Sequence, residues 1–114
     1  MPIRYYISLK HPQKARGTDD AFSFTAHGAD EFAAQLQDAL RSDGSFQRWR
    51  DAQDDPEAVD PALGGSDPTA TVTGQQHDLQ IDLVAVTSIP GSVLKHRLRL
   101  LAGSAWELRD VSNA

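Results

Sequence analysis

Cysteine is absent from this chain of 114 residues. Its absence excludes disulfide bonds, thiol catalysis and cysteine-based zinc sites. The chain also lacks any stretch of about 20 apolar residues, the length that a membrane-spanning helix requires. Its first residues contain no apolar run of the kind found in signal peptides. We therefore expect a cytoplasmic protein with no membrane partner.

Basic residues are in the minority, because 11 Lys and Arg stand against 16 Asp and Glu and give a net charge of −5. This balance argues against a wholly basic nucleic-acid-binding protein but leaves room for a local basic patch. Hydrophobic residues make up 39% of the chain and charged residues 24%, as in globular proteins. The length predicts a single domain over residues 1–114.

The charges are segregated along the chain. Residues 4–16 include four basic side chains and no acidic one, whereas residues 51–67 include six acidic side chains and no basic one. The stretch 54–68 also contains three prolines and the pair Gly64-Gly65. This composition predicts a flexible acidic connection near 54–68.

The first half of the chain predicts a strand pair followed by helices. Residues 3–9 alternate as in a half-buried strand, and residues 21–26 alternate as in a second, shorter strand. After Gly28, apolar residues recur at helical spacing. This predicted helix closes at Asp43-Gly44, and a short second helix follows Ser45. The side chains expected to face the core from the first strand and the long helix are Ile3, Tyr5, Ile7, Leu9, Phe32, Leu36, Ala39 and Leu40.

The second half predicts four strands that form an antiparallel meander. The expected strands are 69–73, 78–87, 93–101 and 105–111, with a turn at 74–77 and a type II turn at Ile89-Pro90-Gly91-Ser92. The fold class is therefore α+β, with a four-stranded antiparallel meander packed on the helix. Its inner face is expected to include Leu79, Ile81, Leu83, Leu98, Leu100, Trp106 and Leu108.

A closed sheet is the alternative architecture. The last four strands could form a small, strongly bent β-barrel capped by the helix. A helix followed by a meander is also the element order of Sm-like RNA-binding barrels, although neither short motif of that family is present.

The most regular alternation in the chain suggests a basic surface. Read as a strand, Lys95-His96-Arg97-Leu98-Arg99-Leu100 places Lys95, Arg97 and Arg99 on one face. Such a row could bind a polyanion or an acidic partner. The alternative, which we favour, is that Asp82 and Glu107 on flanking strands pair with these cations.

A second basic cluster lies in the predicted loop that follows the first strand. Lys10, Lys14 and Arg16 stand there together with His11. Loops carry binding residues more often than their share of the chain. These three cations are therefore further candidates for polyanion or partner binding.

Catalytic patterns are not evident. The histidines lie outside the HxH and HExxH spacings of metal sites, no serine lies in a GxSxG elbow, and no glycine-rich phosphate loop precedes a Lys-Ser/Thr pair. We expect no cofactor, no metal site and no enzyme activity.

The sequence therefore favours a non-enzymatic module that acts by association, with itself or with another protein. An unpaired edge at the last strand, 105–111, is the expected means of pairing. One alternative is a nucleic-acid-binding small barrel that uses the basic strand face. A further alternative is a protein with a small-molecule pocket or a cryptic enzyme.

Overall fold

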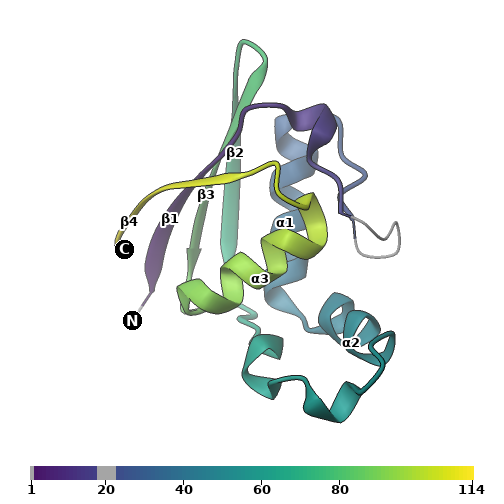
Figure 1. The fold of residues 1–114 in the computed structure, drawn as a ribbon. Helices are drawn as coiled ribbons and strands as arrows, with labels where there is room; N and C mark the ends of the chain where they lie inside the picture. The colour runs from purple at the N-terminus through teal and green to yellow at the C-terminus, as the bar shows by residue number, and fades with distance from the viewer. Residues whose placement is uncertain (1, 18–22) are drawn as a thin grey trace.

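The fold is built around a four-stranded antiparallel sheet with the strand order β2-β3-β1-β4 (Figure 1). The computed structural model describes residues 2–17 and 23–114. Strands β2 and β4 lie at the two edges of an open sheet, so the α+β prediction is confirmed and the closed-barrel alternative is wrong. The strands are β1 (Ile3–Leu9), β2 (Thr71–His77), β3 (Gln80–Thr87) and β4 (Glu107–Asn113).

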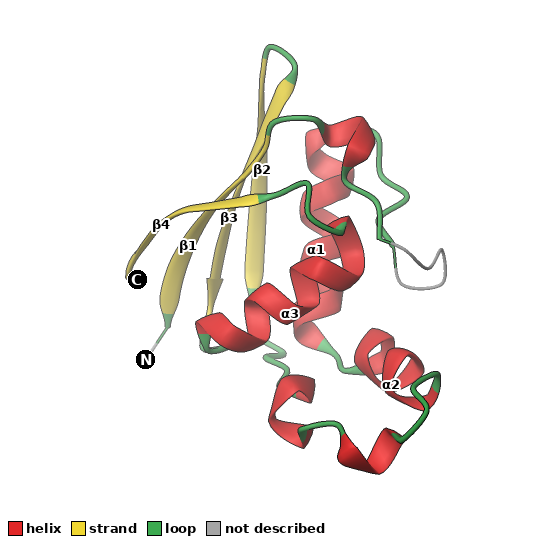
Figure 2. Ribbon diagram, in the orientation of Figure 1, coloured by secondary structure: helices red, strands yellow, loops and turns green. Residues whose placement is uncertain are grey.

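Within the described residues, three helices accompany the sheet, and α1 and α3 cover one of its faces (Figure 2). Short 3-10 turns lie in the segments that connect these helices to the strands. The helices are α1 (Ala29–Arg41), α2 (Gly44–Asp51) and α3 (Gly91–Ala102), and the turns are η1 (Pro12–Lys14), η2 (Pro56–Ala58) and η3 (Pro61–Gly64).

The predictions for β1 and α1 are confirmed. Ile3 is half-buried, while Tyr5, Ile7 and Leu9 are fully buried, as alternation requires. Helix α1 follows Gly28 and buries all four of the residues expected from its spacing. Its end differs from the prediction, because Ser42 is the C-cap and Asp43 precedes α2. Gly44 does not take the left-handed conformation; among the described residues, positive φ occurs only at Asp78 and Gly103.

The segment 93–101 is not a strand but most of helix α3, and this corrects the largest error of the sequence analysis. Its buried residues recur in adjacent pairs every four positions, which is a helical period. Pro90 is the N-cap instead of a turn residue, and Gly103, with φ of +63°, ends the helix. The buried positions are Val93, Leu94, Arg97, Leu98, Leu101 and Ala102.

Helix α3 changes the topology from a meander to a crossover. The chain leaves β3, passes through α3 and returns as β4, while β1 lies between these two strands. The order β1-α1-β2-β3-α3-β4, with α2 inserted before β2, is the split βαβ arrangement called ferredoxin-like. Many unrelated activities use this arrangement, so the topology alone indicates no function.

Three smaller predictions also need correction. Residues 23–27 form no strand, and residues 21 and 22 of the second predicted strand lie outside the described part of the chain. The β2–β3 hairpin turns at Asp78-Leu79, because strand β2 continues to His77. Leu79 is 84% exposed at this turn, so its predicted place in the core is wrong.

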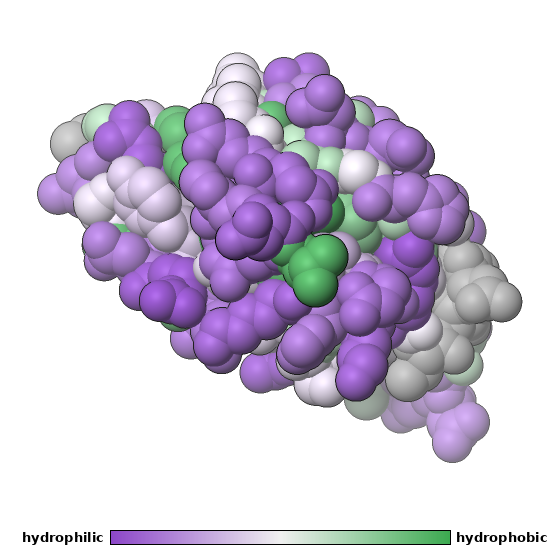
Figure 3. All heavy atoms as spheres, turned by 90° about the horizontal axis from the view of Figure 1, so that it is seen from above, coloured by the Kyte–Doolittle hydropathy of each residue, from purple (hydrophilic) through white to green (hydrophobic). Residues whose placement is uncertain are grey.

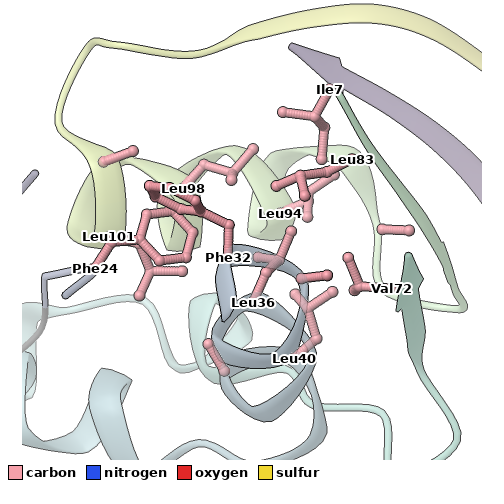
Figure 4. Close-up of a cluster of buried hydrophobic side chains, with 14 of the residues drawn as sticks. Ile7, Phe24, Phe32, Leu36, Leu40, Val72, Leu83, Leu94, Leu98 and Leu101 are labelled. Atoms are coloured by element: carbon pink, nitrogen blue, oxygen red, sulfur yellow. The ribbon is translucent and has the colours of Figure 1, made fainter. Parts of the chain in front are cut away.

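The core lies between the helix-covered face of the sheet and helices α1 and α3 (Figure 4). Phe24 and Phe32 meet edge to face, with ring centroids 4.9 Å apart. Trp106 and Leu108 pack against this core but are only partly buried. The residues labelled in Figure 4 come from α1, α3, strands β1, β2 and β3, and the segment before α1. They are Ile7, Phe24, Phe32, Leu36, Leu40, Val72, Leu83, Leu94, Leu98 and Leu101.

Truncation of a side chain in this core gives a first testable prediction. Leu98 is fully buried on the α3 face that contacts the core. We expect Leu98→Ala to lower the free energy of unfolding by about 3 kcal/mol, because it removes apolar contacts and leaves a cavity. Urea denaturation measures this loss. Leu79→Ala at the exposed turn is the control, and an equal effect of both substitutions would contradict the described core.

The acidic stretch 54–68 contains the two 3-10 turns η2 and η3. Residues 54–58 are mostly exposed, whereas Asp67 at the far end is buried. The Asp67 N–H donates a hydrogen bond to the Leu40 carbonyl, 2.7 Å away, at the end of α1. The stretch is thus attached to the domain at its C-terminal end, and its mobility stays a prediction.

Candidate functional site

The face of the sheet opposite α1 and α3 is not covered by any described helix (Figure 2). Strand pairing sets its side chains in rows, because residues directly opposite one another share a face. The middle row pairs Thr73, Val84, Tyr6 and Asp110, and the row beside it pairs Thr71, Val86, Arg4 and Ser112. On the other side of the middle row stand Gln75, Asp82, Ser8 and Glu107. We call these twelve residues the open face.

The centre of the open face is apolar. Tyr6, Val84 and Val86 are half-buried although no helix lies over them. A shallow depression of about 390 Å³ lies beside them, between Tyr6, Gln75 and Arg109. An aromatic ring and two branched apolar side chains surrounded by polar groups have the composition of a protein interface centre with a polar rim.

Asp82 organises the polar part of the open face. The Ser8 hydroxyl and the Gln80 side-chain amide each donate a hydrogen bond to Asp82 Oδ1 over 2.9 Å. His77 Nε2 lies 3.5 Å from Asp82 Oδ2. The carboxylate is therefore fixed by neighbours on its own sheet. The predicted pairing of Asp82 with the cations of residues 95–99 is wrong.

Glu107 likewise finds other partners than those predicted. Its carboxylate lies 3.3 Å from Lys10 Nζ and 3.3 Å from Arg109 Nη1. These contacts link β4 to the end of β1 and place charges along an edge strand. The pairing of β1 with β4 also shifts register between Tyr6 and Ile7.

The terminal strand is an edge strand, as the sequence analysis expected. However, its charges and its irregular register are features that oppose strand addition. The other edge, β2, is partly covered by α1. Gln37 Oε1 accepts a hydrogen bond from the Val72 N–H over 3.1 Å, and Arg41 Nε donates one to the Ala70 carbonyl over 2.7 Å. The open face is thus less obstructed than either edge of the sheet.

The predicted row of cations does not exist as a row. Because residues two apart on a helix point about 200° away from each other, the strand interpretation grouped side chains that the helix separates. Lys95 and Arg99 are exposed on α3, whereas Arg97 is fully buried. The structural premise of a basic strand face is therefore wrong.

Arg97 is surrounded by carbonyl groups at the junction of α3, the end of α1 and η3. Its Nη1 donates to the Ala39 carbonyl and, over 3.3 Å, to the Ser42 carbonyl. Its Nη2 donates to the Leu63 and Gly65 carbonyls over 3.3 Å and 2.9 Å. Burial lowers the pKa of Arg97 and the charge of Asp43 opposes that shift, but a guanidinium stays protonated at neutral pH. We assign Arg97 a structural role.

His96, the neighbour of Arg97 on α3, is half-buried. Its ring packs edge to face on Trp49 with centroids 4.5 Å apart. Its Nδ1 is buried and has no hydrogen-bond partner among the described residues. Burial, aided by the charges of Arg97 and Arg99, lowers the pKa of His96. This surrounding favours a neutral imidazole packed between α2 and α3.

The amino-terminal cluster is only partly brought together. Lys14 lines a small depression beside Trp106, and Arg16 lines a different one beside Phe32. Lys10 and His11 line both. The grouping of Arg16 with Lys10 near the hairpin turn is the part of this prediction that the geometry supports.

The residues at the centre of the open face are not among those predicted from the sequence to form a site. The signal was present, since Tyr6 alternates with buried residues in β1, and Val84 and Val86 alternate with buried residues in β3. No described helix covers the side of β3 on which Val84 and Val86 lie. No three His, Asp or Glu side chains of the described residues are grouped closely enough to hold a metal ion.

Comparisons with known proteins give no match to a family model, to a curated protein or to a solved structure. Within the described residues, no helix has both the length and the apolar character needed to cross a membrane.

Proposed function

We propose that this domain acts by association and that it forms a homodimer in which the open faces of two copies stack. The observation that carries the proposal is the apolar centre formed by Tyr6, Val84 and Val86 on an uncovered sheet face. Tyrosine and arginine are enriched at interface centres, and Arg4 and Arg109 flank this centre on the same face.

Charge complementarity supports a second copy as the partner. Arg4 stands on one side of the middle row, and Asp82 and Glu107 stand on the other. A twofold axis that lies between two stacked faces, above the middle row and across the strands, places the Arg4 side of one copy over the Asp82 side of the other. The same axis brings the two Tyr6 rings together at the centre.

The size of the open face limits the strength of such a dimer. Strands of seven or eight residues and a width of four strands give a face of roughly 20 Å by 20 Å. In plan this is about 400 Å², less than the about 800 Å² that each partner buries in a standard interface. We therefore expect a reversible dimer that dissociates in the micromolar range or above.

Sedimentation velocity over a concentration series from about 1 µM to about 1 mM tests the proposal, because a weak dimer shows a rising mass in this range. We expect Val84→Asp to abolish the rise, since it places two carboxylates at the dimer centre. Leu79→Asp, the same kind of change at an exposed position outside the open face, is the matched control and should leave the dimer intact.

A charge exchange examines the orientation of the two copies. Arg4→Glu should weaken the dimer, and the double variant Arg4→Glu/Asp82→Arg should restore part of the loss, as complementary charges are re-formed across the interface. A protein that remains monomeric at the highest concentration would refute the homodimer. Dimers that form equally well in Val84→Asp would place the interface elsewhere.

A further inference from the structure

A second depression, separate from the open face, lies where the β2–β3 hairpin turn approaches η1 and the start of α1. Its volume is about 380 Å³, near the lower end of the range of about 300–1,000 Å³ for ligand pockets. Its polar lining includes Lys10, His11, Arg16, His27 and Gln76. Seen from above (Figure 3), this end of the molecule is mostly hydrophilic, and hydrophobic atoms show in places between the polar side chains. We call it the hairpin pocket.

We propose that the hairpin pocket binds a small organic anion that has an aromatic or other apolar body. The inference does not depend on the proposed dimer, because none of its lining residues is among the twelve of the open face.

The charge of the lining is the first argument. Two cationic side chains and two histidines line the hairpin pocket, and no carboxylate of the described residues does so. This is a local excess of positive charge in a chain whose net charge is −5. Such a concentration of one sign raises the local concentration of an oppositely charged ligand.

The geometry of Arg16 is the second argument. Its Nη2 donates a hydrogen bond to the Ala26 carbonyl over 2.6 Å, and its Nη1 donates one to the Ala15 carbonyl over 3.0 Å. Its guanidinium carbon lies 5.7 Å from the centre of the Phe32 ring. These contacts hold the guanidinium in place, and they use only two of its five N–H donors.

The remaining donors of Arg16 can bind a carboxylate or a phosphate with the fork geometry that guanidinium groups provide. No carboxylate within the described residues forms an ion pair with Arg16. Lys10 differs in this respect, because it is 3.3 Å from Glu107. Arg16 is therefore the anion-binding group of the pocket, and Lys10 stands at its rim.

The apolar part of the lining is the third argument. Phe32, Ile81 and Ala26 are buried residues that contribute to the wall, and Leu79 stands 84% exposed beside them. An inorganic anion would satisfy Arg16 but would leave these apolar groups in contact with water. A ligand with a planar apolar body covers them as well, and it would shield part of Leu79.

Titration of ¹⁵N-labelled protein, followed by amide chemical shifts, tests the proposal with four probes. Benzoate and phenyl phosphate carry a charged head on an aromatic ring, benzamide carries the ring without the charge, and inorganic phosphate carries the charge without the ring. We expect saturable shifts at residues 10–16, 26–28 and 76–81 with benzoate, with phenyl phosphate or with both. The stronger of these two probes identifies the head group.

Variants separate a bound anion from a general charge effect. Arg16→Gln should weaken the binding of the stronger probe about tenfold, as expected for loss of charged hydrogen bonds. Lys95→Gln, which removes an exposed cation from α3, should leave it unchanged. Because Arg16 also holds the Ala26 carbonyl, Leu79→Ser provides a second variant on an exposed side chain, and it should weaken binding about threefold.

Three results would overturn the proposal. They are the absence of saturable shifts with both aromatic anions, equal binding of benzamide, and equal losses in Arg16→Gln and Lys95→Gln. Inorganic phosphate that binds as tightly as phenyl phosphate would refute the apolar part of the site.

Discussion

Arg97→Ala is expected to lower the free energy of unfolding by about 4 kcal/mol, which is a large part of the 5–15 kcal/mol that stabilises a typical domain. The substitution removes a fully buried side chain and four hydrogen bonds. It leaves the carbonyls of Ala39, Ser42, Leu63 and Gly65 without their donor, and each buried polar group without a partner costs about 1–3 kcal/mol. Water that enters the cavity recovers only part of this loss.

The position of these carbonyls explains why a guanidinium is used. Ala39 and Ser42 lie at the end of α1, where the last carbonyls have no partner within the helix and carry its partial negative charge. Leu63 and Gly65 belong to η3 and its C-cap. One planar group with forked donors can reach both segments, and it thereby fastens the connection before β2 to the end of α1.

Two further substitutions separate charge from volume. Arg97→Met keeps most of the volume but no donor, and we expect a loss of about 3 kcal/mol from the unsatisfied carbonyls. Arg97→Lys keeps the charge with fewer and differently directed donors, and we expect an intermediate loss of about 2 kcal/mol. Arg99→Ala on the exposed side of the same helix should change stability by less than about 0.5 kcal/mol.

Urea denaturation and amide hydrogen exchange together measure these effects. Exchange should accelerate first in residues 42–66, which lose their attachment, before it accelerates in β1 and β3. An Arg97→Met variant as stable as the parent protein would show that the four carbonyls do not need the guanidinium.

The misreading of α3 shows where a sequence pattern is insufficient. In residues 93–101 a strand alternation and a helical period both fit, because Leu98 and Leu100 satisfy the first while Val93, Leu94, Leu98 and Leu101 satisfy the second. Local chemistry favoured the helix. Leu, Lys and Arg are good helix formers, and only Val93 is β-branched. Pro90 before the segment and Gly103 after it are typical of helix ends.

Arg97 itself weakened the helical pattern, since a charged residue stands where the helix has its apolar stripe. Its burial depends on carbonyls contributed from residues 39, 42, 63 and 65. No periodicity within 93–101 contains that information. By contrast, β1 and α1 were predicted well because their buried faces are uninterrupted.

The candidate sites were less predictable than the fold class for a related reason. Arg16 and Phe32 are 16 positions apart in the chain, and the hairpin pocket forms only when the β2–β3 turn lies beside them. Which face of the sheet stays uncovered depends on the face against which α1 and α3 pack. Alternation separates the two faces of β1, but the identity of the covered face follows from the packing of α1 and α3.

Substitution of Asp67 is the second change for which we expect a large loss of stability, and this loss should depend on pH. Its Oδ1 accepts hydrogen bonds from the N–H and the hydroxyl of Thr69, and its Oδ2 accepts from the Thr87 hydroxyl and the Ser88 N–H. The Ser88 N–H and the other three donors hold the pKa of Asp67 well below its usual range, although burial acts in the opposite direction. The carboxylate thus joins the start of β2 to the end of β3 from inside the acidic stretch.

Asp67→Asn is expected to lower the free energy of unfolding by about 3 kcal/mol at neutral pH. An asparagine offers one oxygen, so its amide nitrogen must face either the two Thr69 donors or the Thr87 and Ser88 donors. In either orientation the N–H groups of the asparagine amide face a backbone N–H group, which cannot accept a hydrogen bond. Asp55→Asn, an exposed residue in the same acidic stretch, is the control and should change stability by less than about 0.5 kcal/mol.

The pH dependence follows from the lowered pKa. A carboxyl whose pKa is lower in the folded state than its unfolded value of about 3.9 stabilises the fold above that pH. This contribution is lost as the pH falls from about 4 towards the folded-state pKa, because the unfolded chain then binds a proton that the folded chain does not. Urea denaturation of the parent and Asp67→Asn at several pH values should therefore show a difference that is largest near pH 7 and narrows below about pH 4. A difference that stays constant down to about pH 2 would contradict this expectation, because it would mean that the pKa of Asp67 is the same in the folded and the unfolded chain.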